Sequence, residues 1–161
     1  MKRIKSRIEP HWDSVEVVLP VHFSEVDSMK LVWHGHYLRY VESAREAYFR
    51  DRGLSYQQME DGDCIAPVVR LQIEYLAPAR MGQVITARCA HIPLTGPTFD
   101  LFYEVRGPSA DPQRPGKLLC IAETVQVFID RSGQPYLSPP PPVEALFADI
   151  HARELALAER R

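Results

Sequence analysis

The 161-residue sequence lacks any long uncharged hydrophobic run, and no uncharged segment approaches the ~18–20 residues that span a bilayer. Its basic N-terminus is not followed by the apolar core of a signal peptide. These two absences argue against a membrane partner and against secretion. We therefore expect a cytoplasmic protein.

An excess of charge of one sign is also missing. Lysine and arginine number 19, aspartate and glutamate number 21, and the formal net charge is −2. The basic residues are scattered among the acids and do not form the one-sided patch that a phosphate backbone attracts. Nucleic acid is therefore not expected as a partner.

Cysteine is scarce, with three residues at wide spacing and no CxxC pair. An odd, dispersed set indicates neither a disulfide framework nor a zinc knot, so we expect buried free thiols at Cys64, Cys89 and Cys120. No metal or other cofactor is expected. Four histidines are too dispersed to suggest a metal site: His11, His22, His91 and His151.

What is present is the composition of one folded domain. Hydrophobic residues make up 45% of the chain and charged residues 25%, which allows a sizeable core. No internal repeat is visible. We expect a single domain over residues 1–161, with a core at about 14–130 and a C-terminal proline-rich spacer and helix at 138–161.

One long amphipathic helix begins near Tyr37. Apolar side chains recur at Tyr37, Val41, Ala44 and Tyr48, steps of four, three and four that form a single stripe. Gly53 stands where a residue in the left-handed conformation would end the helix. The pattern predicts a helix with one buried face.

The remaining core segments indicate a sheet. Alternating or β-branched runs predict five main strands, and the links between the later strands are too short to carry a crossover helix. The sheet is therefore expected to be mostly antiparallel, with the long helix on its face. Residues 54–63 are polar and turn-prone and are predicted as a connection. The predicted strands cover residues 14–24, with a bend near Pro20, and residues 65–76, 83–92, 98–106 and 117–129.

An acid lies close to the entrance of the long helix. Asp27 precedes His34, Gly35 and His36, and free backbone N–H groups with a partial positive charge gather at a helix N-terminus. A carboxylate beside unpaired amide donors is an arrangement suited to catalysis. The structural alternative is an acid that merely favours the helix dipole.

The order of these motifs resembles the hotdog-fold acyl-CoA thioesterases of the 4-hydroxybenzoyl-CoA thioesterase and YbgC-like family. The resemblance covers roughly Val17 to Ile129, and its motifs are F-x-x-x-D, V-W-H-x-x-Y and a helix bearing E-x-x-R. The matching residues are Phe23, Asp27, Val32, Trp33, His34, Tyr37, Glu42 and Arg45.

This resemblance implies an α+β hotdog fold, in which a five-stranded, mostly antiparallel sheet wraps a long central helix. It also implies a homodimer or homotetramer with the active site at a subunit interface. Asp27 would be the catalytic carboxylate, and the backbone N–H of His34 would hold the thioester oxygen. The substrate would be an acyl-CoA or an acyl-carrier-protein thioester.

The sequence departs from the family at three places. Lys30 stands where relatives usually carry glycine, so the turn must differ or tolerate a side chain, and Lys30 could face the substrate. His36 replaces a small residue or asparagine and could line the acyl pocket, although a structural role is the simpler hypothesis. The uncharged residues 95–97 replace a basic cluster that some relatives offer to the coenzyme A nucleotide. The candidate substrate-binding residues are Lys30, Trp33, His36, Tyr37 and Thr98.

Three functions stay open from the sequence. The leading hypothesis is thioester hydrolysis with Asp27 as general base or nucleophile. A dehydratase or hydratase acting on acyl thioesters is a second, and a non-catalytic acyl-thioester binding module is a third. Glu42 is expected to pair with Arg45 or Arg50 on the helix surface and is a weaker candidate for the catalytic acid.

Overall fold

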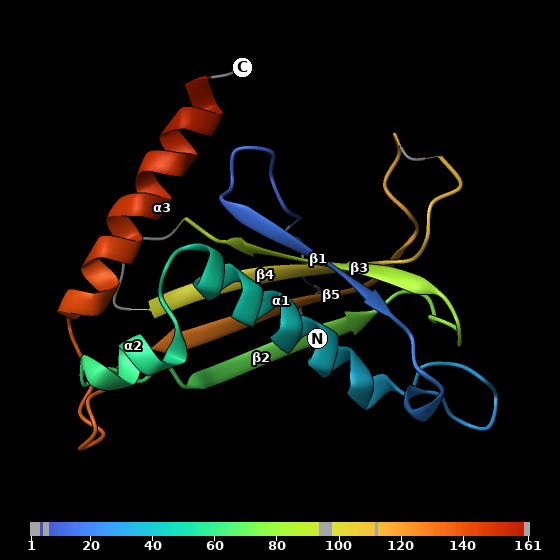
Figure 1. The fold of residues 1–161 in the computed structure, drawn as a ribbon, viewed down its shortest axis with the longest axis horizontal. Helices are drawn as coiled ribbons and strands as arrows, with labels where there is room; N and C mark the ends of the chain where they lie inside the picture. The colour runs from blue at the N-terminus through green and yellow to red at the C-terminus, as the bar shows by residue number, and fades with distance from the viewer. Residues whose placement is uncertain (1–3, 5–6, 94–97, 112, 160–161) are drawn as a thin grey trace.

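The computed structural model describes residues 4, 7–93, 98–111 and 113–159. A five-stranded antiparallel sheet forms its centre, with spatial order β1-β3-β4-β5-β2 (Figure 1). The predicted α+β hotdog architecture is confirmed. The strands are β1 Ser14–Pro20, β2 Val68–Tyr75, β3 Val84–His91, β4 Thr98–Arg106 and β5 Leu118–Val127.

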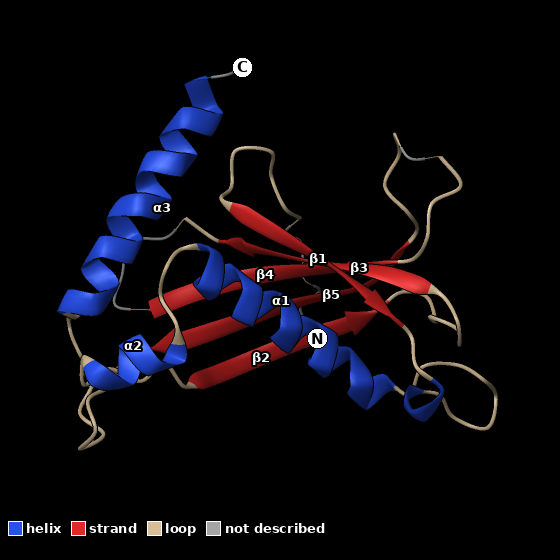
Figure 2. Cartoon of the chain, viewed as in Figure 1, coloured by secondary structure: helices blue, strands red, loops and turns tan. Residues whose placement is uncertain are grey.

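The long helix α1, Tyr37–Asp51, packs across one face of the sheet, mainly against β1 and β3 and less against β4 (Figure 2). All four residues of the predicted stripe are buried. Gly53 has a φ of +69°, and its N–H donates to the carbonyl of Arg50 at 3.1 Å. The predicted buried face and the predicted stop are both confirmed.

Because α1 lies over the β1 side of the sheet, the edge strand β2 keeps much of its apolar surface uncovered. Val69 is 58% exposed, Leu71 41% and Tyr75 46%. Exposed apolar side chains on an unpaired sheet edge are a feature that proteins normally cover. Apolar side chains of this edge strand are therefore left in contact with solvent.

The connection after α1 contains a helix that the sequence did not predict. Helix α2, Tyr56–Asp61, begins with a capping box in which the N–H of Gln58 donates to the Ser55 hydroxyl at 3.2 Å. The Ser55 N–H donates in return to the Gln58 side chain at 2.8 Å. The Ser-x-x-Gln spacing was the available signal, and the polar composition of the segment concealed it.

Two predicted strands are each four residues shorter than expected, and the others differ by less. β1 ends at Pro20, and Phe23–Glu25 forms a 3-10 turn, η1, where the strand was predicted to continue. β2 begins at Val68, while Ile65 forms only an isolated bridge with Ile129. In the first case proline, which cannot donate to a ladder, marks the end of the strand.

The C-terminal helix α3, Pro141–Glu159, lies outside one end of the sheet (Figure 1). It starts within the predicted spacer, because a proline in the first helical turn has no intrahelical N–H bond to lose. Val143, Leu146 and Ile150 bury its inner face. Phe147 packs edge-on against Phe99 of β4, with ring centroids 5.5 Å apart.

All three cysteines are buried and free, as predicted. Burial raises the pKa of the Cys64 thiol to about 11 and that of the Cys120 thiol to about 12. Both therefore stay in the weakly nucleophilic thiol form at neutral pH. In the part of the chain that the structure describes, no helix combines the length and apolar character needed to cross a bilayer.

Candidate active site

Asp27 lies at the start of a tight turn in a short hairpin between β1 and α1. A bridge joins Val26 to Val32, and the Asp27 N–H donates to the Leu31 carbonyl at 2.8 Å. Asp27 Oδ1 accepts the N–H groups of Met29 at 2.8 Å and Leu31 at 3.3 Å. No described residue bonds to Oδ2. One carboxylate oxygen therefore holds the turn, and the other has no hydrogen-bond partner among the described residues.

Lys30 completes this turn in the left-handed conformation, with a φ of +60°. Its N–H donates to the Asp27 carbonyl at 2.9 Å. Left-handed backbone costs a residue with a Cβ about 1 kcal/mol or more and costs glycine little. The sequence left two possibilities for this position, a different turn or the glycine-type turn with a side chain in it. The structure has the second. The side chain of Lys30 is exposed.

The hairpin leads directly into a 3-10 turn, η2, His34–His36, and then into α1. Across the described residues, the N–H groups of His34 and Gly35 have no hydrogen-bond acceptor. They lie at the positive end of the helix dipole. A Cβ built on Gly35 would overlap the indole ring of Trp33, so only glycine lets this ring lie against the backbone here.

A cavity of about 310 Å³ opens beside these amides. Its lining comes from the helix entrance and from the end of β2: Val32, His34, Tyr37, Tyr75, Leu76, Ala77 and Pro78. The Tyr75 hydroxyl donates to the His34 carbonyl at 3.0 Å, and the Tyr37 hydroxyl accepts the Ala79 N–H at 2.8 Å. The two tyrosines thus join β2 and the segment after it to the helix entrance.

Burial raises the pKa of both Tyr37 and Tyr75 above the usual tyrosine value. Both hydroxyls therefore remain protonated across the neutral range. A protonated Tyr75 can keep donating to the His34 carbonyl, which fixes the orientation of the peptide between His34 and Gly35. The N–H of Gly35 belongs to this peptide and is therefore held in a fixed orientation.

Most of the predicted site residues lie together on this one segment. The indole of Trp33 is half-exposed and lies 4.8 Å from the His34 ring and 5.6 Å from the His36 ring, between centroids. Asp27 and Lys30 occupy the hairpin turn, and Tyr37 is buried at the start of α1. The 310 Å³ cavity includes His34 and Tyr37 and does not include the turn residues.

Thr98 is not brought to this group within one protomer. Thr98 begins β4 near the pair between Leu101 and His91, at the C-terminal end of β3. The Asp27 hairpin follows Pro20, which pairs with Val84 at the N-terminal end of β3. Thr98 therefore lies at the opposite end of the sheet from Asp27. Residues 95–97, where the basic cluster of some relatives would lie, are outside the described residues.

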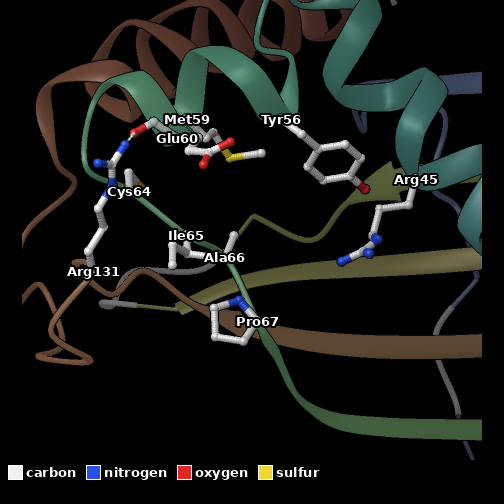
Figure 3. A pocket seen from close by; sticks show the side chains of 9 residues that line it. All are labelled: Arg45, Tyr56, Met59, Glu60, Cys64, Ile65, Ala66, Pro67 and Arg131. Atoms are coloured by element: carbon white, nitrogen blue, oxygen red, sulfur yellow. Dashed lines mark hydrogen bonds between the residues drawn. The ribbon is translucent and has the colours of Figure 1, made fainter.

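A second cavity, of about 440 Å³, lies at the opposite end of β2 (Figure 3). Its walls come from α2, from the segment before β2 and from the middle of α1, and they are largely apolar apart from two arginines and one glutamate. Arg45 donates to Glu42 at 2.6 Å and to the buried Gln126 side chain at 2.9 Å. The lining residues are Arg45, Tyr56, Met59, Glu60, Cys64, Ile65, Ala66, Pro67 and Arg131.

Sequence reasoning did not select three residues that bond to the segments of the candidate site: Glu25, Tyr40 and Tyr75. Glu25 is buried, and its carboxylate accepts the Tyr40 hydroxyl at 2.9 Å. The sequence offers only weak signals for them, namely an acid inside the F-x-x-x-D spacing and a tyrosine on a predicted strand face. Within the described part of the chain, no three His, Cys, Asp or Glu side chains gather closely enough to hold a metal ion.

Residues 21–149 match the family model of the thioesterase-like superfamily. The chain belongs to this superfamily. The matched range contains the Asp27 hairpin, α1, four of the five strands and the first half of α3.

Individual relatives match this chain over part of its length. The acyl-CoA thioesterase YbgC of Helicobacter pylori is 28% identical over 115 residues, which cover 70% of this chain and 84% of that protein. The putative acyl-CoA thioesterase YneP of Bacillus subtilis is 35% identical over 65 residues, 40% of this chain and 47% of that protein. The second match thus spans less than half of its relative.

The fold of the superfamily is also found in solved structures. A 1,4-dihydroxy-2-naphthoyl-CoA thioesterase from Synechocystis superposes with a TM-score of 0.74 at 21% identity, covering 86% of this chain and 98% of that one. At this identity the likeness concerns the fold. It shows that the sheet and the long helix are arranged as in that protein.

Proposed function

We propose that this protein hydrolyses an acyl thioester to a free acid and a thiol, with Asp27 as the catalytic carboxylate. The observation that carries the proposal is a carboxylate oxygen and two amide donors on one short segment, all without a partner among the described residues. The oxygen is Asp27 Oδ2, and the hairpin that holds Asp27 leads directly to the N–H groups of His34 and Gly35. Membership of the thioesterase-like superfamily supports the same reaction class.

The geometry suits the chemistry of a thioester. Its carbonyl oxygen gains negative charge as the carbon is attacked, so amides at a helix N-terminus stabilise the transition state more than the ground state. The His34 N–H is the proposed donor. A thiolate is a good leaving group, so orientation and charge stabilisation are sufficient and the proposed mechanism needs no metal or other cofactor.

Asp27 acts in this proposal either as a general base on water or as a nucleophile that forms a mixed anhydride. Single-turnover hydrolysis in ¹⁸O-water can identify a nucleophilic role, because label in the Asp27 carboxylate requires an anhydride that water cleaves at the Asp27 carbonyl carbon. A general base places the label only in the product acid, as does an anhydride cleaved at the acyl carbon, so trapping of the anhydride with hydroxylamine is the second measurement.

The primary test is thiol release from a panel of aliphatic and aromatic acyl-CoAs, comparing wild type with Asp27→Asn. Asparagine keeps an oxygen for the turn and removes the negative charge, so we expect a folded protein whose kcat falls by about 10²–10⁴. The matched control is Asp130→Asn. Asp130 also closes a turn, accepting the Gln134 N–H at 2.9 Å, and should leave kcat unchanged.

Three outcomes of this assay would count against the proposal. Near-wild-type hydrolysis by Asp27→Asn would remove Asp27 from the mechanism. Tight binding of acyl-CoA without turnover would favour a binding module, and a product with a new double bond would favour a dehydratase. Activity confined to acyl carrier protein thioesters would keep the reaction and change the thiol donor.

We also propose that two copies of this chain pair along β2 to complete the site. The exposed apolar residues of β2 and the position of that strand at the edge of the sheet support this. An antiparallel two-fold pairing would bring the 440 Å³ cavity of one protomer beside the His34 cavity of its partner, where it could receive the acyl group. Sedimentation of wild type should give a dimer or tetramer, and a monomer at micromolar concentration would contradict this arrangement.

A further inference from the structure

A buried carboxylate lies two residues before Asp27 and has no role in the mechanism proposed above. Glu25 ends the turn η1 and is 8% exposed. Its Oε2 accepts the hydroxyl of Tyr40 at 2.9 Å and the N–H of His22 at 2.7 Å. Its backbone carbonyl accepts the Trp33 N–H at 2.9 Å. Glu25 thus joins the entry to the hairpin, the exit from the hairpin and α1.

Tyr40 is an equally constrained partner. It lies in the first turn of α1, is 3% exposed, and packs edge-on against Tyr37 with ring centroids 5.8 Å apart. Burial and the hydrogen bond to Glu25 raise the pKa of Tyr40, so its hydroxyl stays a donor. This bond joins the segment before Asp27 to α1, whose entrance carries the amide donors of His34 and Gly35.

The hairpin itself does not need this bond to form. It is closed internally by the bridge between Val26 and Val32 and by the Asp27 turn. The bond from Glu25 to Tyr40 instead sets how the closed hairpin sits relative to α1. It is therefore a contact through which the distance between the Asp27 carboxylate and the amides at the helix entrance can be set.

We propose that Glu25 and Tyr40 are positioning residues for thioester hydrolysis, which hold the Asp27 carboxylate in register with the amide donors at the entrance of α1. The proposal rests on the proposed function. A misplacement of about 1 Å between reacting groups can cost as much as 10²-fold in rate, so loss of this bond should lower kcat while substrate binding elsewhere keeps KM.

The chain offers a matched control for this proposal. Tyr48 lies on the same helix, two turns further on, and its hydroxyl donates to the buried carboxylate of Asp13 at 2.7 Å. That pair lies at the far end of α1 from the candidate site. Tyr40→Phe and Tyr48→Phe each remove one tyrosine hydroxyl from one buried carboxylate and differ in distance from the chemistry.

The experiment measures kcat, KM and the thermal midpoint for both variants with the acyl-CoA that wild type hydrolyses fastest. We expect both variants to lose similar stability, Tyr40→Phe to lower kcat by about 10- to 100-fold with KM within about twofold, and Tyr48→Phe to retain wild-type kcat. Equal kcat values in the two variants would overturn the positioning role and leave the thioesterase intact. No thiol release by wild type would overturn the proposed function and this inference with it.

Variants at Glu25 provide the second line of evidence. Both of its side-chain bonds end on one oxygen, so Glu25→Gln keeps an acceptor for both and should retain most of the wild-type kcat. Glu25→Ala should match Tyr40→Phe, and adding Tyr40→Phe to it should lower kcat little further, because residues that act as a unit are not additive. Multiplicative losses in the double variant would contradict a shared role.

Discussion

The two ends of α1 use the same chemical groups in opposite ways. At the C-terminal end, Arg52 and Tyr48 surround the carboxylate of Asp13, and the Arg52 guanidinium lies 3.6 Å over the Tyr48 ring. Every partner in this cluster is satisfied and buried. Near the N-terminal end, one oxygen of Asp27 and the N–H of His34 have no partner among the described residues. The closed network at the C-terminal end stabilises the fold, whereas the groups proposed for catalysis lie beside a closed pair of the N-terminal end, Glu25 and Tyr40.

The largest expected effect is at the C-terminal end of α1, the closed end, where Asp13, Tyr48 and Arg52 form the buried cluster. Asp13→Ala leaves the buried guanidinium of Arg52 without its main partner, and we expect a loss of about 3–5 kcal/mol in the free energy of unfolding. Urea titration measures this loss. Asp51→Ala is the control, because Asp51 is 55% exposed and lies 3.4 Å from the same arginine, so little stability should change. An equal loss in both variants would mean that burial of the pair is not the cause.

A substitution at the N-terminal end of α1, the open end, should lower activity and change stability little. Gly35→Ala forces the Trp33 indole away from the backbone, and because this ring is half-exposed the displacement costs little stability. The amides of His34 and Gly35 shift with it, and we expect kcat to fall about tenfold or more. Thiol release and a thermal midpoint on the same samples test both parts. A destabilised variant with wild-type kcat would contradict this account of Gly35.

The closed end should also carry a pH dependence. Burial lowers the pKa of His91. The hydrogen bond that His91 donates to the Glu154 carboxylate and the nearby charges of Glu154, Asp13 and Asp100 oppose this shift without cancelling it. Near pH 6.5 the unfolded chain therefore protonates His91 more readily than the native state does. The free energy of unfolding should fall as the pH drops through about 6.5, the usual pKa of histidine. Urea titrations at pH 7.5 and 5.5 measure this, and His91→Gln should weaken the dependence. The exposed His151 of α3 is the control, and His151→Gln should leave the dependence unchanged.

The smallest expected effect concerns the turn beside Asp27. Lys30→Gly removes the cost of a left-handed side-chain-bearing residue and should raise the free energy of unfolding by up to about 1 kcal/mol. The other described non-glycine residue with positive φ, Asp63, belongs to a type that tolerates this conformation, and Asp63→Gly should give no such gain. If the Lys30 side chain contacts the substrate, KM rises in Lys30→Gly while stability still improves. A loss of stability would show that this side chain supports the turn.

Local patterns in the sequence predicted most of the fold. The α1 stripe, its stop at Gly53 and the existence of all five strands follow from periodicity and turn residues that act within a few positions. Helix α2 was missed because its cap was masked by polar composition, and β1 was extended past Pro20. The hotdog arrangement itself came from the resemblance carried by the Asp27 and E-x-x-R motifs.

The contacts that distinguish the two ends of α1 could not be predicted in the same way. The hydroxyl of Tyr48 reaches Asp13 across 35 positions, and His91 reaches Glu154 across 63. Such pairings depend on strand register and helix placement, which periodicity does not specify. The motif predicted that Asp27 and His34 lie on one segment, whereas only the folded chain shows that Glu25 and Tyr40 join that segment to the helix.

The order of the strands has a consequence for how the molecule is assembled. β3, β4 and β5 are consecutive and neighbouring, so they can form as a local meander, while β2 must pair with β5 across some 45 to 58 positions. Local contacts form faster than distant ones because less chain entropy is lost in closing them. The strand that carries Tyr75 to the His34 carbonyl should therefore dock late. A refolding sample can regain most of its sheet signal before it regains turnover.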